Sequence, residues 1–205
     1  MSDNKSMAAM TLVIVAVAIM AFNQYTLMSI NGGTAAITGN VVAEQQNAAT
    51  LQEAIDAVIP RGVPAVYGEE LGVSFDKPQE SLNILANLDG DLYDNGKLHF
   101  ADLTAEQQES YKQIGASIAC EYCCGATTLI FSNGQPACGC AHSAGMRGLA
   151  MYLLINNPEM SNEQILDELT DWKALFFPKE MVAKYMQQNG LTQGAAELPD
   201  MVGGC

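Results

Sequence analysis

Residues 120–142 read CEYCCGATTLIFSNGQPACGCAH, and this stretch holds five of the six cysteines and one of the two histidines of the chain. Cysteines lie at both of its ends, and a segment rich in β-branched and aromatic residues lies between them. The dipeptide Asn133-Gly134 favours a tight hairpin turn, which would bring the two groups of cysteines together. The stretch therefore predicts a small β-hairpin with thiols on both arms.

Two ligand pairs on a short hairpin, with a helix starting at the second pair, are typical of treble-clef and ribbon zinc modules. The C-x2-C spacing lets the first pair converge on one ion, and Gly125 and Gly139 allow the backbone to turn tightly around it. We therefore predict a treble-clef-like or ribbon-like metal site. Its primary ligands are expected to be Cys120, Cys123, Cys138 and Cys140, with Cys124 and His142 in reserve.

The thiol ligands leave the identity of the metal open, because thiolates bind zinc, copper(I) and iron–sulfur clusters alike. Zinc is the first expectation and copper the second, since a C-x-C pair with methionines nearby favours a soft ion. An iron–sulfur cluster is the third. The alternative without a metal is a set of disulfides. A bridge between adjacent Cys123 and Cys124, or between Cys138 and Cys140, would be strained, so only bridges between the arms are feasible.

Patterns on both sides of this stretch predict a mainly α-helical domain. Thr50, Thr104 and Ser161 each begin a capping box, with Glu or Gln three residues later. Apolar residues then recur at helical spacing on one face. The helices expected are 50–59, 78–88, 104–118, 143–154, 161–176 and 178–185.

The N-terminal region predicts a membrane anchor. No charged residue occurs from Ser6 to Val42, and residues 7–30 are long enough to cross a bilayer as a single helix. A cleaved signal peptide and a buried soluble helix are the alternatives, although the only A-x-A-like triplet lies inside the apolar run. Lys5 precedes the span, so the positive-inside rule places the N-terminus in the cytoplasm and the rest of this single-pass cell-membrane protein outside. The expected parts are an anchor (1–30), a tether (31–47), a mostly helical metal-binding domain (48–189) and a flexible tail (190–205).

The charge balance excludes one class of partner. Nine Lys and Arg stand against 23 Asp and Glu, which gives a formal net charge of −14. Binding of nucleic acid through a general basic surface needs clustered cations that neutralise phosphates. We therefore expect no nucleic-acid partner.

Three strings, CEYCCG, NGQPACGCAHSAGMRGL and WKALFFP, resemble those of uncharacterised prokaryotic membrane-anchored proteins that share a CEYCCG…CGCAHS core. The resemblance extends over residues 60–180. The triplet Cys138-Gly139-Cys140 more weakly resembles extracytoplasmic lipoproteins with a PCYCGC motif, but this chain has no PCYC string and no lipobox cysteine near its N-terminus. The resemblance implies a location in the cell envelope and metal-linked thiols, and neither group supplies an activity to transfer.

The expected function is that of a membrane-anchored extracytoplasmic metal-binding protein. An enzyme is less favoured, because no acid–base or substrate-binding motif accompanies the cysteines. One alternative is a thiol–disulfide or redox protein that uses Cys120 and Cys123. Another is a disulfide-stabilised structural domain that presents its helices to a protein partner of unknown identity.

Two further features are expected to have ordinary structural roles. Arg147, one turn into the helix after the cysteines, would offset thiolate charge or else form a common ion pair or surface contact. The acidic segment from Asp89 to Gly96 misses the glycine and glutamate positions of an EF-hand, so a solvated turn is expected there.

Overall fold

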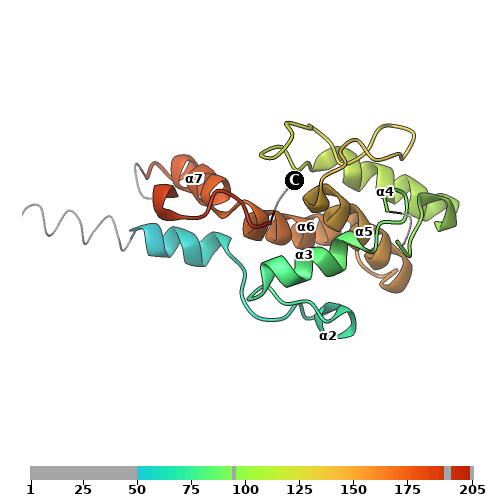
Figure 1. The fold of residues 1–205 in the computed structure, drawn as a ribbon, viewed down its shortest axis with the longest axis horizontal. Coiled ribbons are helices and arrows are strands. Elements are labelled where there is room, and N and C mark those ends of the chain that lie inside the picture. The colour runs from blue at the N-terminus through green and yellow to red at the C-terminus, as the bar shows by residue number, and fades with distance from the viewer. Residues whose placement is uncertain (1–49, 94–95, 192–194, 204–205) are drawn as a thin grey trace, which may run out of the picture. The chain divides into compact units, whose positions relative to one another are not determined.

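Helix α5 (Ala141–Asn156) is the central element of the fold, and every residue from His142 to Leu154 is buried. A helix that is apolar on all sides must be covered on all sides. Helices α3, α4 and α6 provide that cover, since each of them packs against α5 (Figure 1). The predicted mainly helical fold is confirmed, and the residue that begins α5 belongs to the cysteine-rich stretch.

The computed structural model describes residues 50–93, 96–191 and 195–203. They belong to the second of the two units into which the chain divides, Thr50–Cys205. Within these ranges no helix is long and apolar enough to cross a membrane. The predicted anchor (7–30) and tether (31–47) lie outside the described residues.

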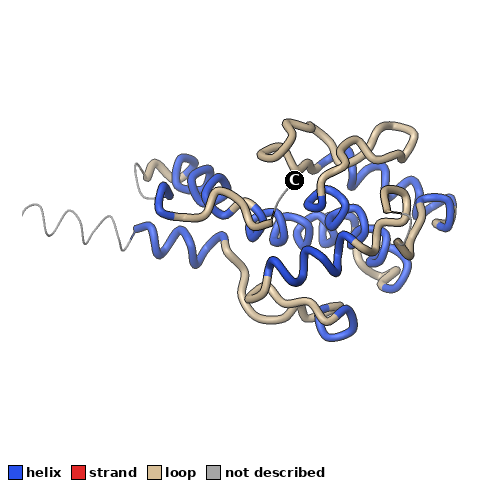
Figure 2. Tube along the Cα trace, viewed as in Figure 1, coloured by secondary structure: helices blue, strands red, loops and turns tan. Residues whose placement is uncertain are grey.

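The remaining elements are short helices joined by loops (Figure 2). Residues 50–58 are helical. The other elements in chain order are α2 (Gly68–Leu71), α3 (Pro78–Ala86), the 3-10 turn η1 (Phe100–Asp102), α4 (Ala105–Ser117), α6 (Asn162–Phe176), α7 (Pro178–Gln188) and the 3-10 turn η2 (Ala195–Glu197).

Local sequence signals account for α4 and α6. Both helices begin with the predicted capping box, formed by Thr104 with Gln107 and by Ser161 with Gln164. These boxes satisfy backbone N–H groups that a helix start leaves without partners. The predicted apolar stripe of α6 is fully buried, as each of its members has no exposed surface: Ile165, Leu169, Trp172 and Phe176.

Small residues of α5 allow α3 to approach closely. A Cβ built on Gly148 would lie 2.7 Å from the carbonyl oxygen of Leu85 and 2.7 Å from the Cβ of Leu88. A Cβ on Gly145 would meet its nearest atom, on Leu82, at 3.5 Å. The α3–α5 contact therefore depends on Gly148, whereas Gly145 leaves room for a methyl group.

The predicted β-hairpin is not formed as a pair of strands, and no strand occurs in the described parts of the chain. The Asn133-Gly134 region does turn back, with Phe131 N donating to Gln135 O at 2.8 Å, but the arms share a single bridge, between Ile130 and Pro136. Pro136 has no N–H to extend a ladder. The other arm also bonds elsewhere, since Leu129 N donates to Gly115 O at the end of α4, at 2.8 Å.

Residues 195–203 of the C-terminal segment pack against the helices. Ala195 is buried in a small second core with Ala54, Val182 and Met186. Val202 N donates to Phe176 O at 2.9 Å. This packing brings the backbone of Val202 to the cysteine-rich stretch.

Candidate metal centre

The first two cysteines lie on a tight turn that follows α4. Cys123 N donates to Cys120 O at 3.1 Å, and Gly125 N donates to Glu121 O at 3.1 Å. Gly125 has φ 71, a left-handed conformation that glycine adopts without steric cost. The turn places the sulfurs of Cys120 and Cys123 on the same side, as the C-x2-C spacing predicts.

Helix α6 holds this turn in place. Lys173 is 7% exposed, and its Nζ lies 2.8 Å from a carboxylate oxygen of Glu121 and 5.1 Å from the ring centre of Tyr122. A largely desolvated ammonium group gains from both an ion pair and an aromatic face. The ion pair with Lys173 lowers the pKa of Glu121, so its carboxylate is charged at neutral pH.

Cys140 is the N-cap residue of α5. Its Sγ accepts a hydrogen bond from Ser143 N at 3.4 Å, and it lies 3.3 Å from Cys120 Sγ. The hydrogen bond with Cys120, helped by the Ser143 N–H, lowers the pKa of Cys140. The same bond, together with burial, raises the pKa of Cys120. Cys140 is therefore the more acidic thiol of the pair, at a position where the positive end of the helix dipole stabilises a thiolate.

His142 lies in the first turn of α5 and has no exposed surface. Its ring packs against Phe176 and Phe177, with centroid distances of 5.2 and 4.8 Å. Its Nε2 lies 2.7 Å from Val202 O, a carbonyl that can only accept, so Nε2 carries the proton. Nδ1 is the other ring nitrogen. It is buried and has no hydrogen-bond partner among the described residues.

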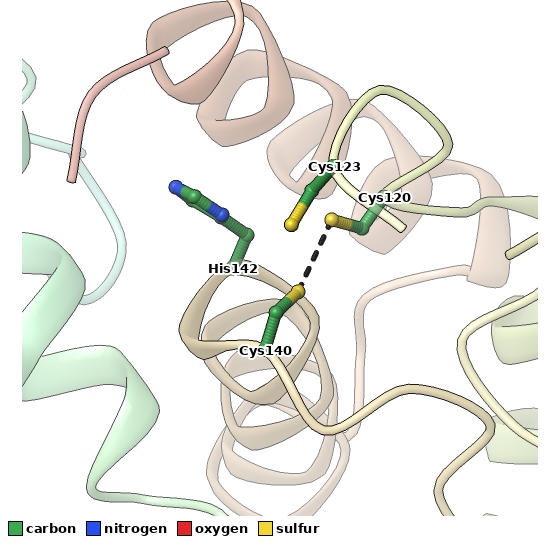
Figure 3. A group of neighbouring side chains, drawn as sticks. All are labelled: Cys120, Cys123, Cys140 and His142. Carbon is green, nitrogen blue, oxygen red and sulfur yellow. Dashed lines mark hydrogen bonds between the residues drawn. The ribbon is translucent and has the colours of Figure 1, made fainter. Parts of the chain in front are cut away.

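Three sulfurs and this imidazole form one compact group (Figure 3). The donor atoms of Cys120, Cys123, Cys140 and His142 all lie within 4.8 Å of one another. In Figure 3 the sulfurs converge, and one ring nitrogen of His142 is on their side while the other is directed away. Cys123 is disulfide-bonded in this structure, so it can serve as a ligand only after reduction to the thiol. The chain thus contains a buried Cys/His cluster that could bind a metal ion.

A second group shares one sulfur with the first. It comprises Cys124, Cys138 and Cys140, of which Cys124 is exposed and Cys138 half-buried. The sulfurs of Cys124 and Cys138 are 2.6 Å apart. All six residues predicted from the sequence therefore lie in one region. The structure groups His142 with the first set and Cys138 with the second, whereas the sequence ranked Cys138 ahead of His142.

A buried ion pair of Arg147, whose partner the sequence did not predict, supports the second arm. Arg147 and Asp89 both have fully buried side chains, and Arg147 Nη2 lies 2.7 Å from Asp89 Oδ2. Arg147 Nη1 also donates to the carbonyls of Leu129 at 3.3 Å and of Cys138 at 2.9 Å. An arginine within an otherwise apolar helix was the signal that a buried acidic partner must exist. Asp89 belongs to the segment for which a solvated turn was expected, and its side chain is wholly buried instead.

Comparisons of the chain with models of protein families, with curated proteins and with solved structures found no match. The site itself therefore defines the class: a helical domain with a buried cysteine and histidine cluster.

Proposed function

We propose that this protein is a membrane-anchored extracytoplasmic metal-binding protein, and that Cys120, Cys123, Cys140 and His142 hold one zinc ion. The observation that carries the proposal is the imidazole of His142. A buried ring nitrogen that accepts no hydrogen bond costs free energy unless another group binds its lone pair. Nδ1 faces three sulfurs, and a metal ion is the group that would satisfy all four donors together.

The donor set and its size fit zinc. Three cysteines and one histidine are a standard set for structural zinc, in a tetrahedron whose Zn–S distances of about 2.3 Å put sulfurs about 3.8 Å apart. The four donor atoms are within 4.8 Å of one another, which is near the spacing that such a tetrahedron requires. The bond from Nε2 to Val202 O is the kind of outer contact that orients a ligating histidine. Four protein donors leave no open position, which favours a structural ion over a catalytic one.

Copper is the second choice for the metal. Thiolates bind Cu(I) well, and imidazole suits copper as it suits zinc. An iron–sulfur cluster is third, since the histidine is its less common ligand.

Elemental analysis of the full-length chain, purified under reducing conditions without added metal, tests the proposal. We expect one zinc per chain in the wild type and loss of zinc in Cys120→Ser, Cys140→Ser and His142→Gln. Cys124→Ser is the matched control, because it removes a nearby exposed thiol outside the four-residue group, and it should keep its zinc. Absence of any metal from the reduced wild type would overturn the proposal, and stoichiometric copper would reassign the ion.

The location is part of the proposal and has its own test. It is supported by the uncharged stretch 7–30, by Lys5 before it and by the resemblance to membrane-anchored envelope proteins. A membrane-impermeant maleimide, applied to intact cells after a membrane-impermeant reductant, should label exposed Cys124. Labelling only after lysis would reverse the orientation.

A redox function is the second candidate, and one observation favours it. Cys123 is disulfide-bonded, and the buried Cys120 and Cys140 sulfurs lie 3.3 Å apart. If these thiols serve electron transfer, mass spectrometry of metal-free protein would find quantitative disulfides at Cys120 and Cys140 as well. Metal bound at one equivalent to the reduced chain would exclude this use of the buried thiols.

A further inference from the structure

Cys124 and Cys138 lie outside the proposed ligand set, yet their sulfurs are closer together than those of Cys120 and Cys140. The separation of 2.6 Å is well inside the ordinary contact distance of two sulfur atoms. It approaches the S–S bond of about 2.05 Å. Both residues are free cysteines in this structure. They come from opposite arms of the turn, 14 positions apart in the chain.

We propose that Cys124 and Cys138 are a surface redox pair, which forms and releases a disulfide between the two arms by exchange with a low-molecular-mass disulfide. The buried group of Cys120, Cys123, Cys140 and His142 keeps its metal while this pair changes state. That second statement rests on the proposed function, whereas the pairing itself does not.

The backbone already holds the two residues in place for pairing. Arg147 Nη1 donates to Cys138 O at 2.9 Å, and Ala137 N donates to Leu129 O at 3.0 Å. On the other arm, the Gly125 N–H closes the turn that contains Cys124. None of these bonds uses the two sulfurs, so forming the disulfide breaks none of them.

Exposure separates this pair from the buried thiols. Cys120 is 0% and Cys140 7% exposed, whereas Cys124 is exposed and Cys138 half-buried. A disulfide in solution therefore reaches Cys124 first, because access controls the site of thiol–disulfide exchange. Cys138 is then the nearest thiol that can resolve the mixed disulfide.

The exchange is balanced in two steps. The Cys124 thiol loses its proton and its sulfur attacks one sulfur of R–S–S–R, which forms a mixed disulfide and releases R–S⁻, and this takes up a proton. The deprotonated Cys138 sulfur then attacks the Cys124 sulfur of the mixed disulfide and releases the second R–S⁻, which is protonated in turn. Two electrons pass from the cysteine pair to R–S–S–R, and the products are one intrachain disulfide and two R–SH.

Oxidised glutathione is a suitable probe. The reduced, zinc-loaded full-length chain is incubated with it, trapped with N-ethylmaleimide and mapped by mass spectrometry. We expect a single new disulfide, Cys124–Cys138, no change in zinc content, and recovery of both maleimide labels after dithiothreitol. In Cys124→Ser the intrachain bond should be absent while the zinc remains.

Three outcomes would overturn the proposal. They are a stable glutathione adduct on Cys124 with Cys138 still open to alkylation, a bridge from either residue to a buried cysteine, and loss of zinc in step with oxidation. Cys120→Ser separates the two proposals, because it should lose zinc and still form the Cys124–Cys138 bond. If that variant does not fold, wild-type chain stripped of metal with EDTA serves the same purpose. A Cys124–Cys138 disulfide in metal-free wild type supports the redox-pair proposal even if the zinc proposal fails. Absence of this disulfide from metal-free wild type would refute the redox-pair proposal.

Discussion

Replacing Arg147 with methionine removes a buried cation while keeping most of the side-chain volume. Both partners of the Arg147–Asp89 pair have fully buried side chains, and the Nε and Nη2 atoms of Arg147 lie 2.8 and 2.7 Å from the same carboxylate oxygen. Among the described residues, the variant leaves the Asp89 side chain one bond, to Asp91 N at 3.1 Å. An uncompensated carboxylate in the core is the expected result.

The free-energy cost follows from these contacts. Removing one member of a buried ion pair costs roughly 3–5 kcal/mol. The loss of the donor to Cys138 O adds about 1 kcal/mol, whereas Leu129 O retains Ala137 N as a donor. The sum of about 4–6 kcal/mol corresponds to a fall of at least about 8 °C in Tm for a domain of this size.

The loss should depend on pH in a defined direction. Burial raises the pKa of Asp89, and Arg147 opposes that rise. Without Arg147 the folded-state pKa stands still further above the unfolded value of about 3.9. The folded state then binds the proton more tightly, so stability is lost as pH rises from about 4 through the folded pKa. Arg147→Met should be least destabilised near pH 5 and most destabilised at pH 8.

The matched control adds Asp89→Asn, which removes the unpaired charge with little change in shape. The double variant should regain about 2–3 kcal/mol relative to Arg147→Met at pH 8 and should lose the added pH dependence. Thermal unfolding of the zinc-loaded full-length chain, followed by circular dichroism at both pH values, measures this. The reasoning fails if Arg147→Met costs less than about 1 kcal/mol at pH 8, or if Asn gives no rescue there.

Four further substitutions have defined outcomes in the same melting experiment. Gly148→Ala should lower Tm, because its Cβ would lie 2.7 Å from a backbone oxygen of α3. Gly145→Ala should keep or raise Tm, because its Cβ would meet its nearest atom at 3.5 Å and alanine favours a helix. Equal effects of the two substitutions would contradict the packing account. Burial and nearby acidic groups raise the pKa of Asp171 to about 6, so stability is lost as pH rises from about 4 through 6. Asp171→Asn should therefore raise Tm at pH 7.5 and leave it unchanged at pH 4, and a gain of equal size at both pH values would refute that cause. Tyr67→Phe removes the hydroxyl oxygen that accepts a hydrogen bond from Nε1 of Trp172 at 2.7 Å. The substitution should lower the free energy of unfolding by about 1–3 kcal/mol and alter the fluorescence of Trp172, the chain's single tryptophan. An unchanged Tm would show that this hydrogen bond contributes nothing to stability.

Elements defined by local signals could be predicted from the sequence. The caps at Thr104 and Ser161 and the buried face of α6 follow from residues within one helix, because capping and amphipathic periodicity depend on neighbours only a few positions away. The clustering of cysteines in 120–142 was equally visible. These signals do not depend on how the helices pack.

The hairpin and the grouping of the ligands depend on packing instead. Leu129 bonds to α4 and Arg147 as well as to Ala137 of the opposite arm, and no local pattern encodes the first two contacts. Cys138 and His142 each lie two positions from Cys140, on opposite sides. Because α5 begins at Ala141, His142 is carried on a helix that packs beside Phe176, while Cys138 remains on the loop near Cys124.

The Arg147–Asp89 ion pair also depends on packing that the sequence does not reveal. The two residues are 58 positions apart, and an acidic turn-forming sequence around Asp89 is usually solvated. That carboxylate is buried only because α3 packs against α5. The sequence could indicate that Arg147 needs a partner, but not which of 23 acidic residues supplies it.

Removing the metal should loosen one end of the domain without unfolding its core. The proposed ligands come from the turn at Cys120 and the start of α5, and His142 links them to the backbone of Val202. The core of α5 and α6 consists mainly of buried apolar side chains outside the proposed ligand set. Hydrogen exchange before and after EDTA should therefore show lost protection in 118–124 and 195–203 and little change in 146–154 and 165–176. Unchanged exchange in the first two segments would refute metal cross-linking, and equal loss in all four would show that the ion stabilises the whole domain, as in small zinc fingers.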